Sequence, residues 1–157
     1  LNELDTNLSI LDSSIRTGNS MADAILNSKV SLAKAREIDV RVDAHIPVKL
    51  KISEIDLCCI LGNLFDNAID ASMALPPQNR LIRVYMDMKG SRLYISFTNF
   101  TSQKKLGKLG RVFATTKGLG HGLGLSRIET IVEKHDGYLS FNSEDGAFTA
   151  EILLPQE

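Results

Sequence analysis

Apolar residues recur along this chain with two different periods, which predict two kinds of secondary structure. A spacing of three and four residues is typical of helices that cover a core with one face. Strict alternation of apolar and polar residues is typical of strands that present one face to a core. The predicted helices span 20–37, 54–74 and 125–135. The predicted strands span 40–46, 81–88, 92–99, 138–143 and 147–154.

Capping and turn residues mark where these elements begin and end. Ser20 with Asp23 predicts the start of the first helix, and Ser53 with Asp56 predicts the start of the second. Gly137 follows the last helix and predicts its C-cap. The predicted hairpin turns lie at 90–91 and 144–146.

The order of these elements predicts an α+β fold in two layers. About five strands, most of them joined as hairpins, would form a mixed sheet, and three helices would cover one face of it as a two-layer α/β sandwich. Residues 100–113 lie between two elements, are polar and show no period. A loop of this length inside a compact domain is typically a functional lid or a partly disordered segment.

The first residues of the chain carry a different repeat, with apolar positions at alternating intervals of three and four. Two heptads of this kind predict a leading helix that packs on another helix or on its own domain. A break at 17–19 ends the repeat, so we expect a boundary between a leading helix at 1–17 and a domain at 18–157. The heptad positions are Leu1, Leu4, Leu8, Leu11 and Ile15.

Composition excludes several classes of protein. A chain of 157 residues, 43% hydrophobic and 24% charged, fits one soluble domain with a core, and a net charge of -1 gives no general attraction to nucleic acid. No apolar run reaches the roughly 18 residues of a membrane span, and the N-terminus is unlike a signal peptide. The missing initial Met suggests a fragment of a longer protein. Cys58 and Cys59 are expected to be buried thiols in a reducing compartment.

A glycine-rich stretch before the last predicted helix is the first candidate for chemistry. Between Lys117 and Ser126, four glycines stand at every second position. Glycine lets the backbone approach a ligand closely, and the free N–H groups of a first helical turn attract phosphate. Lys117 adds a positive charge suited to phosphate. The other interpretation is a flexible loop before a surface helix.

The helix around residue 60 is the second candidate. Asn63, Asn67 and Asp70 are spaced so that they project within roughly 60° of one another. Amide and carboxylate oxygens at this spacing suit Mg²⁺, which takes one or two protein oxygens together with substrate phosphates. An ordinary solvated face is the alternative. The predicted apolar stripe of the same helix is Leu57, Ile60, Leu61, Leu64, Ala68 and Ala71.

Four segments in this order resemble the motifs of the GHKL ATPase superfamily. Residues 63–71 look like its N-box, 113–117 its F-box and lid, 120–125 its second glycine box, and 146–155 its closing strand. The chain looks most like the ATP-binding domain of sensor histidine kinases of the peptide-pheromone, quorum-sensing receptor type, with a matching start at 17–29. The resemblance covers about residues 53–155.

This resemblance implies ATP with Mg²⁺ as the ligand. Asn63 and Asn67 would hold the metal ion, and Lys117 with the glycine-loop amides would hold the phosphates. Asp70, Asn99 and Thr149 would line the adenine end. These positions form one expected nucleotide site, made of Asn63, Asn67, Asp70, Ala71, Asn99, Lys117, Gly120, His121, Gly122, Leu123, Gly124, Leu125 and Thr149.

Two residues depart from other branches of the superfamily. Asn99 stands where most histidine kinases carry an aspartate followed by glycines, so the charged acceptor for adenine is replaced by an amide oxygen. Asn63 stands where gyrase-like branches carry a glutamate base. An amide cannot take a proton at useful pH, so the site favours phosphoryl transfer over hydrolysis.

The resemblance implies a two-component histidine kinase whose acceptor histidine lies upstream. None of His45, His121 and His135 is on the heptad segment, so none is expected to be phosphorylated. The implied partners are upstream dimerisation and phosphoacceptor helices and a response regulator. The full-length protein would be a homodimer, cytoplasmic here and attached to a membrane only through upstream segments. The alternatives are a non-catalytic nucleotide-binding or scaffolding module and an anti-sigma-factor-type serine kinase.

Overall fold

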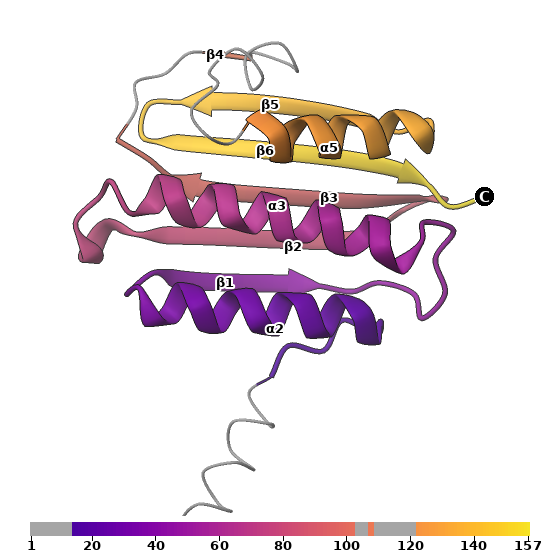
Figure 1. Ribbon diagram of the computed structural model, residues 1–157, viewed down its shortest axis with the longest axis horizontal. Coiled ribbons are helices and arrows are strands. Elements are labelled where there is room, and N and C mark those ends of the chain that lie inside the picture. Colours follow the sequence, from indigo (N-terminus) through magenta and orange to yellow (C-terminus); the bar gives the residue numbers. More distant parts are fainter. Residues whose placement is uncertain (1–13, 103–106, 109–121) are drawn as a thin grey trace, which may run out of the picture.

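The computed structural model describes residues 14–102, 107–108 and 122–157, and the helices and strands within them are drawn in Figure 1. The helices are α2 (Ser20–Ala35), α3 (Glu54–Ser72) and α5 (Gly122–Lys134), with a short 3-10 turn, η1 (Pro77–Asn79). The strands are β1 (Asp39–Ala44), β2 (Leu81–Lys89), β3 (Arg92–Phe100), β4 (Gly107–Lys108), β5 (Tyr138–Glu144) and β6 (Ala147–Pro155).

The described strands form one mixed sheet in the order β1-β2-β3-β6-β5-β4. β1 pairs with β2 in parallel, because α3 crosses between them, and the other pairings are antiparallel. The three helices lie side by side over one face of the sheet (Figure 1). The predicted two-layer α+β fold is confirmed, with five longer strands and the two-residue β4 added at one edge. Within the described ranges, no helix is long and apolar enough to cross a membrane.

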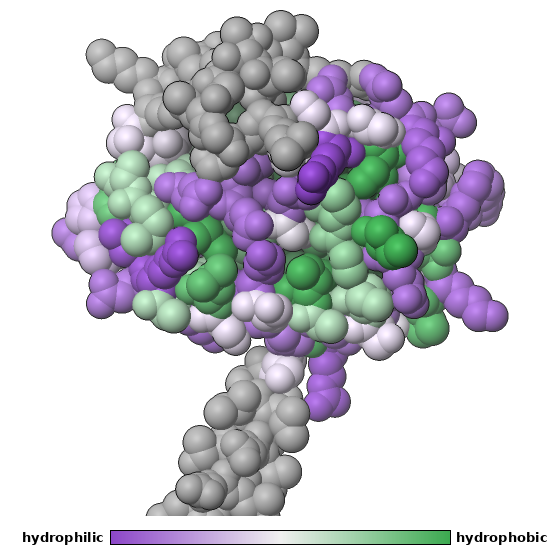
Figure 2. Space-filling model, viewed as in Figure 1, coloured by the Kyte–Doolittle hydropathy of each residue, from purple (hydrophilic) through white to green (hydrophobic). Residues whose placement is uncertain are grey.

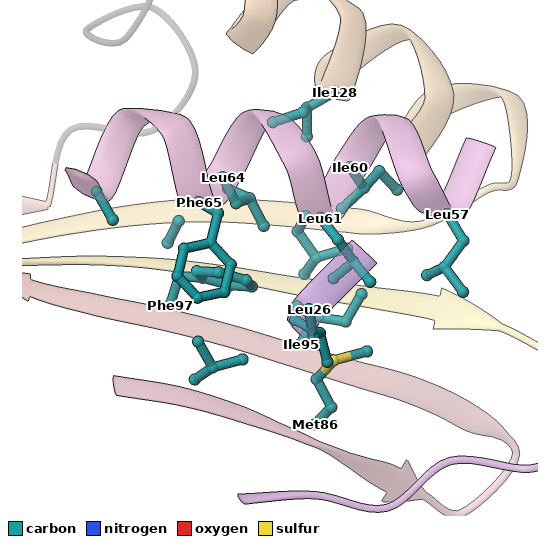
Figure 3. Packing of buried hydrophobic residues seen from close by; sticks show 14 of the residues in the cluster. Leu26, Leu57, Ile60, Leu61, Leu64, Phe65, Met86, Ile95, Phe97 and Ile128 are labelled. Atoms are coloured by element: carbon teal, nitrogen blue, oxygen red, sulfur yellow. The ribbon is translucent and has the colours of Figure 1, made fainter. Parts of the chain in front are cut away.

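Helix α3 is the centre of the fold. It packs against the sheet below it and against α2 and α5 on its two sides, so that more than one stripe of its surface is buried. Its core face is therefore wider than predicted, while Ala71, which was placed in the apolar stripe, is only half-buried. Figure 3 shows part of this cluster, with Phe65 directed at Phe97 and Ile128 reaching α3 from α5. The buried residues of α3 are Leu57, Ile60, Leu61, Leu64, Phe65, Ala68, Ile69 and Ser72.

The outer surface of the helical layer is mixed in character. In Figure 2, apolar and polar residues alternate over this face, without one continuous apolar area among the coloured atoms. The large apolar side chains that are most exposed, Ile55 and Val48, lie near the start of α3 and in the loop before it. This pattern is typical of helices whose other side faces solvent.

The last turn of α5 differs from the predicted glycine cap. The left-handed residue is Asp136, with φ 54°, while Gly137 donates its N–H to the Val132 carbonyl at 2.8 Å. With the bond from the Asp136 N–H to the Glu133 carbonyl, this is a Schellman motif in which glycine takes the following position. Gly137 is required there because a Cβ atom would lie 2.6 Å from the Leu153 carbonyl oxygen.

The Gly137→Ala variant is therefore expected to lower the free energy of unfolding by about 1–3 kcal/mol, the usual cost of forcing an atom into a packed site. Urea denaturation followed by circular dichroism measures this change. Asp136→Gly is the matched control, because it removes the left-handed strain and should leave stability unchanged or higher. An equal loss in both variants would contradict this account of Gly137.

Residues 15–19, which precede α2, are bound tightly to the domain. Two side chains of α2 hold their backbone: Asp23 accepts hydrogen bonds from the Thr17 N–H at 2.6 Å and its hydroxyl at 2.7 Å, and Asn27 bonds both the N–H and the carbonyl of Ile15. The Ile46 N–H donates to the Thr17 carbonyl at 2.9 Å. We call residues 15–19 together with Asp23 and Asn27 the leading clasp.

The leading clasp corrects two expectations. The N-cap of α2 is Asn19, whose side chain accepts from the N–H groups of Met21 and Ala22, whereas Ser20 is already the first helical residue. Ile15, the last heptad position, is not helical and packs against the core. The other four heptad leucines lie outside the described residues.

Candidate functional site

Polar side chains are buried between the two layers at one end of the domain. The ends of β3 and β5, the start of β6 and the C-terminal half of α3 all lie at this end (Figure 1). Asn99 and Thr101 at the end of β3 are 5% and 8% exposed, and Ser143 on β5 is 2% exposed. Buried polar groups need hydrogen-bond partners, so their concentration at one end distinguishes it from the apolar remainder of the core.

Asn63 is held in one orientation on α3. Its side-chain N–H₂ donates to the Cys59 carbonyl at 2.7 Å and to the Cys59 sulfur at 3.3 Å. The amide oxygen is directed toward the first turn of α5, where a Cβ atom added to Gly124 would lie only 2.6 Å from it. Gly124, the last glycine of the glycine-rich stretch, therefore allows the start of α5 to approach the Asn63 oxygen.

Asn67, one turn after Asn63, carries a buried donor that no described residue accepts. Its Nδ2 atom is buried and has no hydrogen-bond partner among the described residues. A buried unpaired donor costs about 1–3 kcal/mol. Such a group is expected where a ligand with acceptor atoms completes the site, and phosphate oxygens are acceptors of this kind.

The remaining strip residues of α3 are less enclosed. Asp70 is exposed and Ala71 is half-buried, so they form the outer part of the strip. Asp66 points away from it, because its carboxylate pairs with the Lys29 ammonium of α2 at 2.7 Å. Successive residues of a helix project about 100° apart, so Asp66 is expected to point away from Asn67, and this ion pair agrees with that geometry.

Asn99 is buried at the end of β3, on the face of the sheet that the helices cover. Its Nδ2 atom donates to the Phe100 carbonyl at 3.1 Å, which leaves the amide oxygen as the group that can accept from a ligand. The predicted role of Asn99 as an acceptor for an exocyclic amino group is compatible with this orientation.

Thr149 does not lie where it was expected. Strand alternation directs its side chain to the open face of the sheet, where its hydroxyl bonds that of Thr98 at 2.9 Å. The sheet therefore separates Thr149 from Asn63, Asn67 and Asn99. Its assignment to the adenine end is wrong for the side chain, because neighbouring residues of a strand face opposite sides.

Three expected phosphate-binding residues, Lys117, Gly120 and His121, lie outside the described residues. Gly122 and Leu123 form the start of α5, which confirms that the glycine stretch opens a helix. Leu125 packs against the core from the same turn. The structure thus describes three parts of the site: the α3 residues Asn63, Asn67 and Asp70, the end of β3, and the first turn of α5.

A second contact joins α3 and α5 at the opposite end from Gly124. The Asp56 carboxylate lies 3.1 Å from His135 Nε2 and 3.0 Å from Lys134 Nζ. Hydrogen bonds from His135 and then Lys134 lower the pKa of Asp56. The two contacts together fix α5 along α3, and so fix the first turn of α5 against Asn63.

Sequence reasoning missed the residues that support the strip. The Cys59 carbonyl and thiol hold Asn63, while both cysteines are free and half-buried instead of fully buried. Burial, together with Glu54, raises the pKa of the Cys58 thiol. Phe148, Thr101 and Ser143 at the sheet end were also missed. Strand alternation would have placed Phe148 on the same face as Ala150 and Ile152, but its position beside Asn99 follows only from the pairing of β3 and β6.

Comparison with known proteins agrees with this geometry. The family model described as the GHKL domain matches residues 52–155, so the chain belongs to the GHKL domain family. It is 28% identical over 141 residues to the probable C4-dicarboxylate sensor kinase of Halalkalibacterium halodurans, covering 85% of this chain and 26% of that protein. It is 32% identical over 128 residues to the sensor histidine kinase ZraS of Escherichia coli K12, covering 78% and 27%.

Solved structures share the fold. The catalytic domain of the histidine kinase ThkA, in a nucleotide-free form, superimposes with a TM-score of 0.71 at 16% identity, covering 90% of this chain and 93% of that one. The mycobacterial sensor histidine kinase MprB gives a TM-score of 0.66 at 19% identity, covering 84% and 93%. The chain spans about a quarter of the length of the curated relatives it matches.

Proposed function

We propose that this chain is the Mg-ATP-binding catalytic domain of a bacterial two-component sensor histidine kinase. Its site would hold ATP so that the γ-phosphoryl group is transferred to a histidine upstream of this segment. The observation that carries the proposal is the pair of amides on α3. Asn63 presents its oxygen to the first turn of α5, and Asn67 one turn later has a buried donor without an acceptor in the described fold.

The described residues fit a magnesium nucleotide by their chemistry. Amide oxygens of Asn63 and Asn67 are hard ligands of the kind Mg²⁺ prefers, and the Asn67 N–H₂ suits a phosphate oxygen. The first-turn N–H groups of α5 add donors for the phosphates. Lys117 would contribute a positive charge there. Bound Mg²⁺ would neutralise charge on the phosphates during transfer.

The residues of the site favour transfer over hydrolysis. Asn63 cannot remove a proton from water, and its N–H₂ is already bonded to Cys59. Catalysis of phosphoryl transfer rests mainly on positioning and on charge neutralisation, which amides and backbone donors can supply. The upstream imidazole that accepts the phosphoryl group would then be positioned elsewhere in the full-length protein.

Several finer features belong to the same proposal. The resemblance of residues 17–29 to the start of that domain supports the peptide-pheromone, quorum-sensing subgroup. The heptad leucines at positions 1, 4, 8 and 11 support a dimerisation helix that ends before Ile15 and is followed by the catalytic domain. Sensor kinases named among the relatives support a homodimer, a response regulator partner, and a cytoplasmic placement with membrane attachment through upstream segments.

Titration calorimetry with ATP, with and without Mg²⁺, tests the proposal. Unmodified protein should bind Mg-ATP without steady hydrolysis. Gly124→Ala should weaken binding about tenfold or more, because the added methyl group would displace the Asn63 oxygen that lies 2.6 Å from its position. Steady ATP turnover that survives Asn63→Ala would contradict the argument against hydrolysis.

Gly62→Ala is the matched control for this experiment. It adds the same methyl group on α3, but the nearest atoms lie 3.9 Å away, which is ordinary contact. It should leave Mg-ATP affinity unchanged and raise stability by about 0.5–1 kcal/mol, since alanine favours a helix interior. If the unmodified chain binds no nucleotide, the non-catalytic scaffolding function replaces the one proposed.

A further inference from the structure

Phe148 lies at the polar end of the interlayer, opposite Asn99. The two residues are Cα partners in the antiparallel pairing of β3 and β6. Residues 150, 152 and 154 of β6 point into the core, so the alternation places Phe148 on the same, helix-covered face. Thr149, which the motif suggested, points the other way.

The ring of Phe148 is fixed by a buried aromatic neighbour. It stacks on Phe141 with ring centroids 5.8 Å apart and planes 24° apart, and Phe141 itself is 1% exposed. Phe148 remains half-buried although it packs against the core. An aromatic ring that is fixed by a buried neighbour and still accessible is a preformed surface for another flat ring.

The groups around Phe148 complement a purine base. Ser143, its partner on β5, and Asn99, its partner on β3, are both buried polar residues. The Asn99 amide oxygen is the acceptor left by its bond to Phe100. A base with an exocyclic amino group could donate to that oxygen while its flat face lies on an aromatic ring, and stacking of this kind tolerates different bases.

We propose that Phe148 is the residue of β6 that contacts the nucleotide base, and that it compensates in part for the missing charged acceptor at position 99. This inference rests on the proposed function and adds a specificity-determining residue to it. Stacking on Phe148 would contribute affinity for the base, and the Asn99 oxygen would contribute selectivity for a base with an exocyclic amino group.

Fluorescence tests the contact directly, because the chain contains no tryptophan. In Phe148→Trp, the introduced indole should be quenched when Mg-ATP is added and should be unaffected by Mg-tripolyphosphate, which lacks a base. Tyr138→Trp is the matched control, since Tyr138 lies on another strand and is 49% exposed. Its emission should not respond to either compound.

Calorimetry adds a second readout. Phe148→Ala should weaken Mg-ATP binding about tenfold, within the range measured for base–aromatic stacking. Wild-type Mg-ATP affinity in Phe148→Ala, or equal quenching of the introduced indole by tripolyphosphate, would overturn the inference while the proposed function stands. Failure of the unmodified chain to bind Mg-ATP would overturn the proposed function, and this inference with it.

Discussion

Replacing Asn67 by alanine is expected to weaken Mg-ATP binding while making the ligand-free domain more stable. The side chain carries a buried Nδ2 atom without a partner among the described residues. A hydrogen bond to a charged group contributes about 1.5–3 kcal/mol, so its loss should reduce affinity roughly ten- to hundredfold. Removing the unpaired donor and an unfavourable helix residue should raise stability by about 1 kcal/mol.

Calorimetry and urea denaturation on the same Asn67→Ala preparation measure the two effects. Asn79→Ala is a matched control, because Asn79 is exposed in η1, and neither quantity should change. The opposite signs of the two effects are the diagnostic result. Unchanged Mg-ATP affinity in Asn67→Ala would show that the ligand site lies elsewhere, and a loss of stability would show that the fold itself uses the amide.

Truncating Phe65 is expected to produce a large loss of stability. Phe65 is fully buried in α3, and its ring meets that of Phe97 edge to face at 5.2 Å between centroids. Phe65→Ala should lower the free energy of unfolding by about 3–5 kcal/mol, since it removes buried apolar area and leaves a cavity. Phe65 does not belong to the asparagine pair on the same helix, so the folded variant should keep its nucleotide affinity. Binding should fall only under conditions in which the variant begins to unfold.

Ile55→Ala is the matched control for Phe65→Ala. Ile55 lies on the same helix and is 82% exposed, so its truncation should change stability by less than about 0.5 kcal/mol. Urea denaturation at constant pH gives both values. A loss below about 1.5 kcal/mol in Phe65→Ala would mean that the surrounding core collapses into the cavity.

The sequence predicted the elements of this fold well because each is short and strongly periodic. The hairpin of β2 and β3 and the cap at Ser53 lie where local patterns placed them. The predicted apolar stripe of α3 was too narrow, because it did not include Phe65 and Ile69, which are buried in the structure. A single stripe is the pattern of a helix with one neighbour, and α3 has neighbours on three sides.

The candidate site was predicted only as far as local spacing determines it. The helical period brings Asn63 and Asn67 to one face, and the structure places the start of α5 beside Asn63. The error at Thr149 arose because a motif locates a strand but does not state which of two neighbouring residues faces inward. Pairing between β3 and β6, which joins residues about fifty positions apart, decides that question.

The glycine after α5 gives a similar lesson about helix ends. Local rules expect glycine to take the left-handed position, and here Asp136 takes it. The reason for Gly137 lies in the β6 backbone, whose Leu153 carbonyl leaves no room for a Cβ atom. From one sequence, a glycine required by a contact with a distant strand cannot be distinguished from a glycine required as a helix cap.

The leading clasp has a mechanical consequence. A flexible tether would absorb any rotation of the chain before it, but Asp23 and Asn27 fix the backbone of residues 15 and 17 to α2. A displacement of residues 15–17 would therefore reach α2 directly through these hydrogen bonds. The Lys29–Asp66 pair passes it on to α3, the helix that carries Asn63 and Asn67. The backbone that precedes α2 is thereby linked to the helix that carries both asparagines of the proposed site.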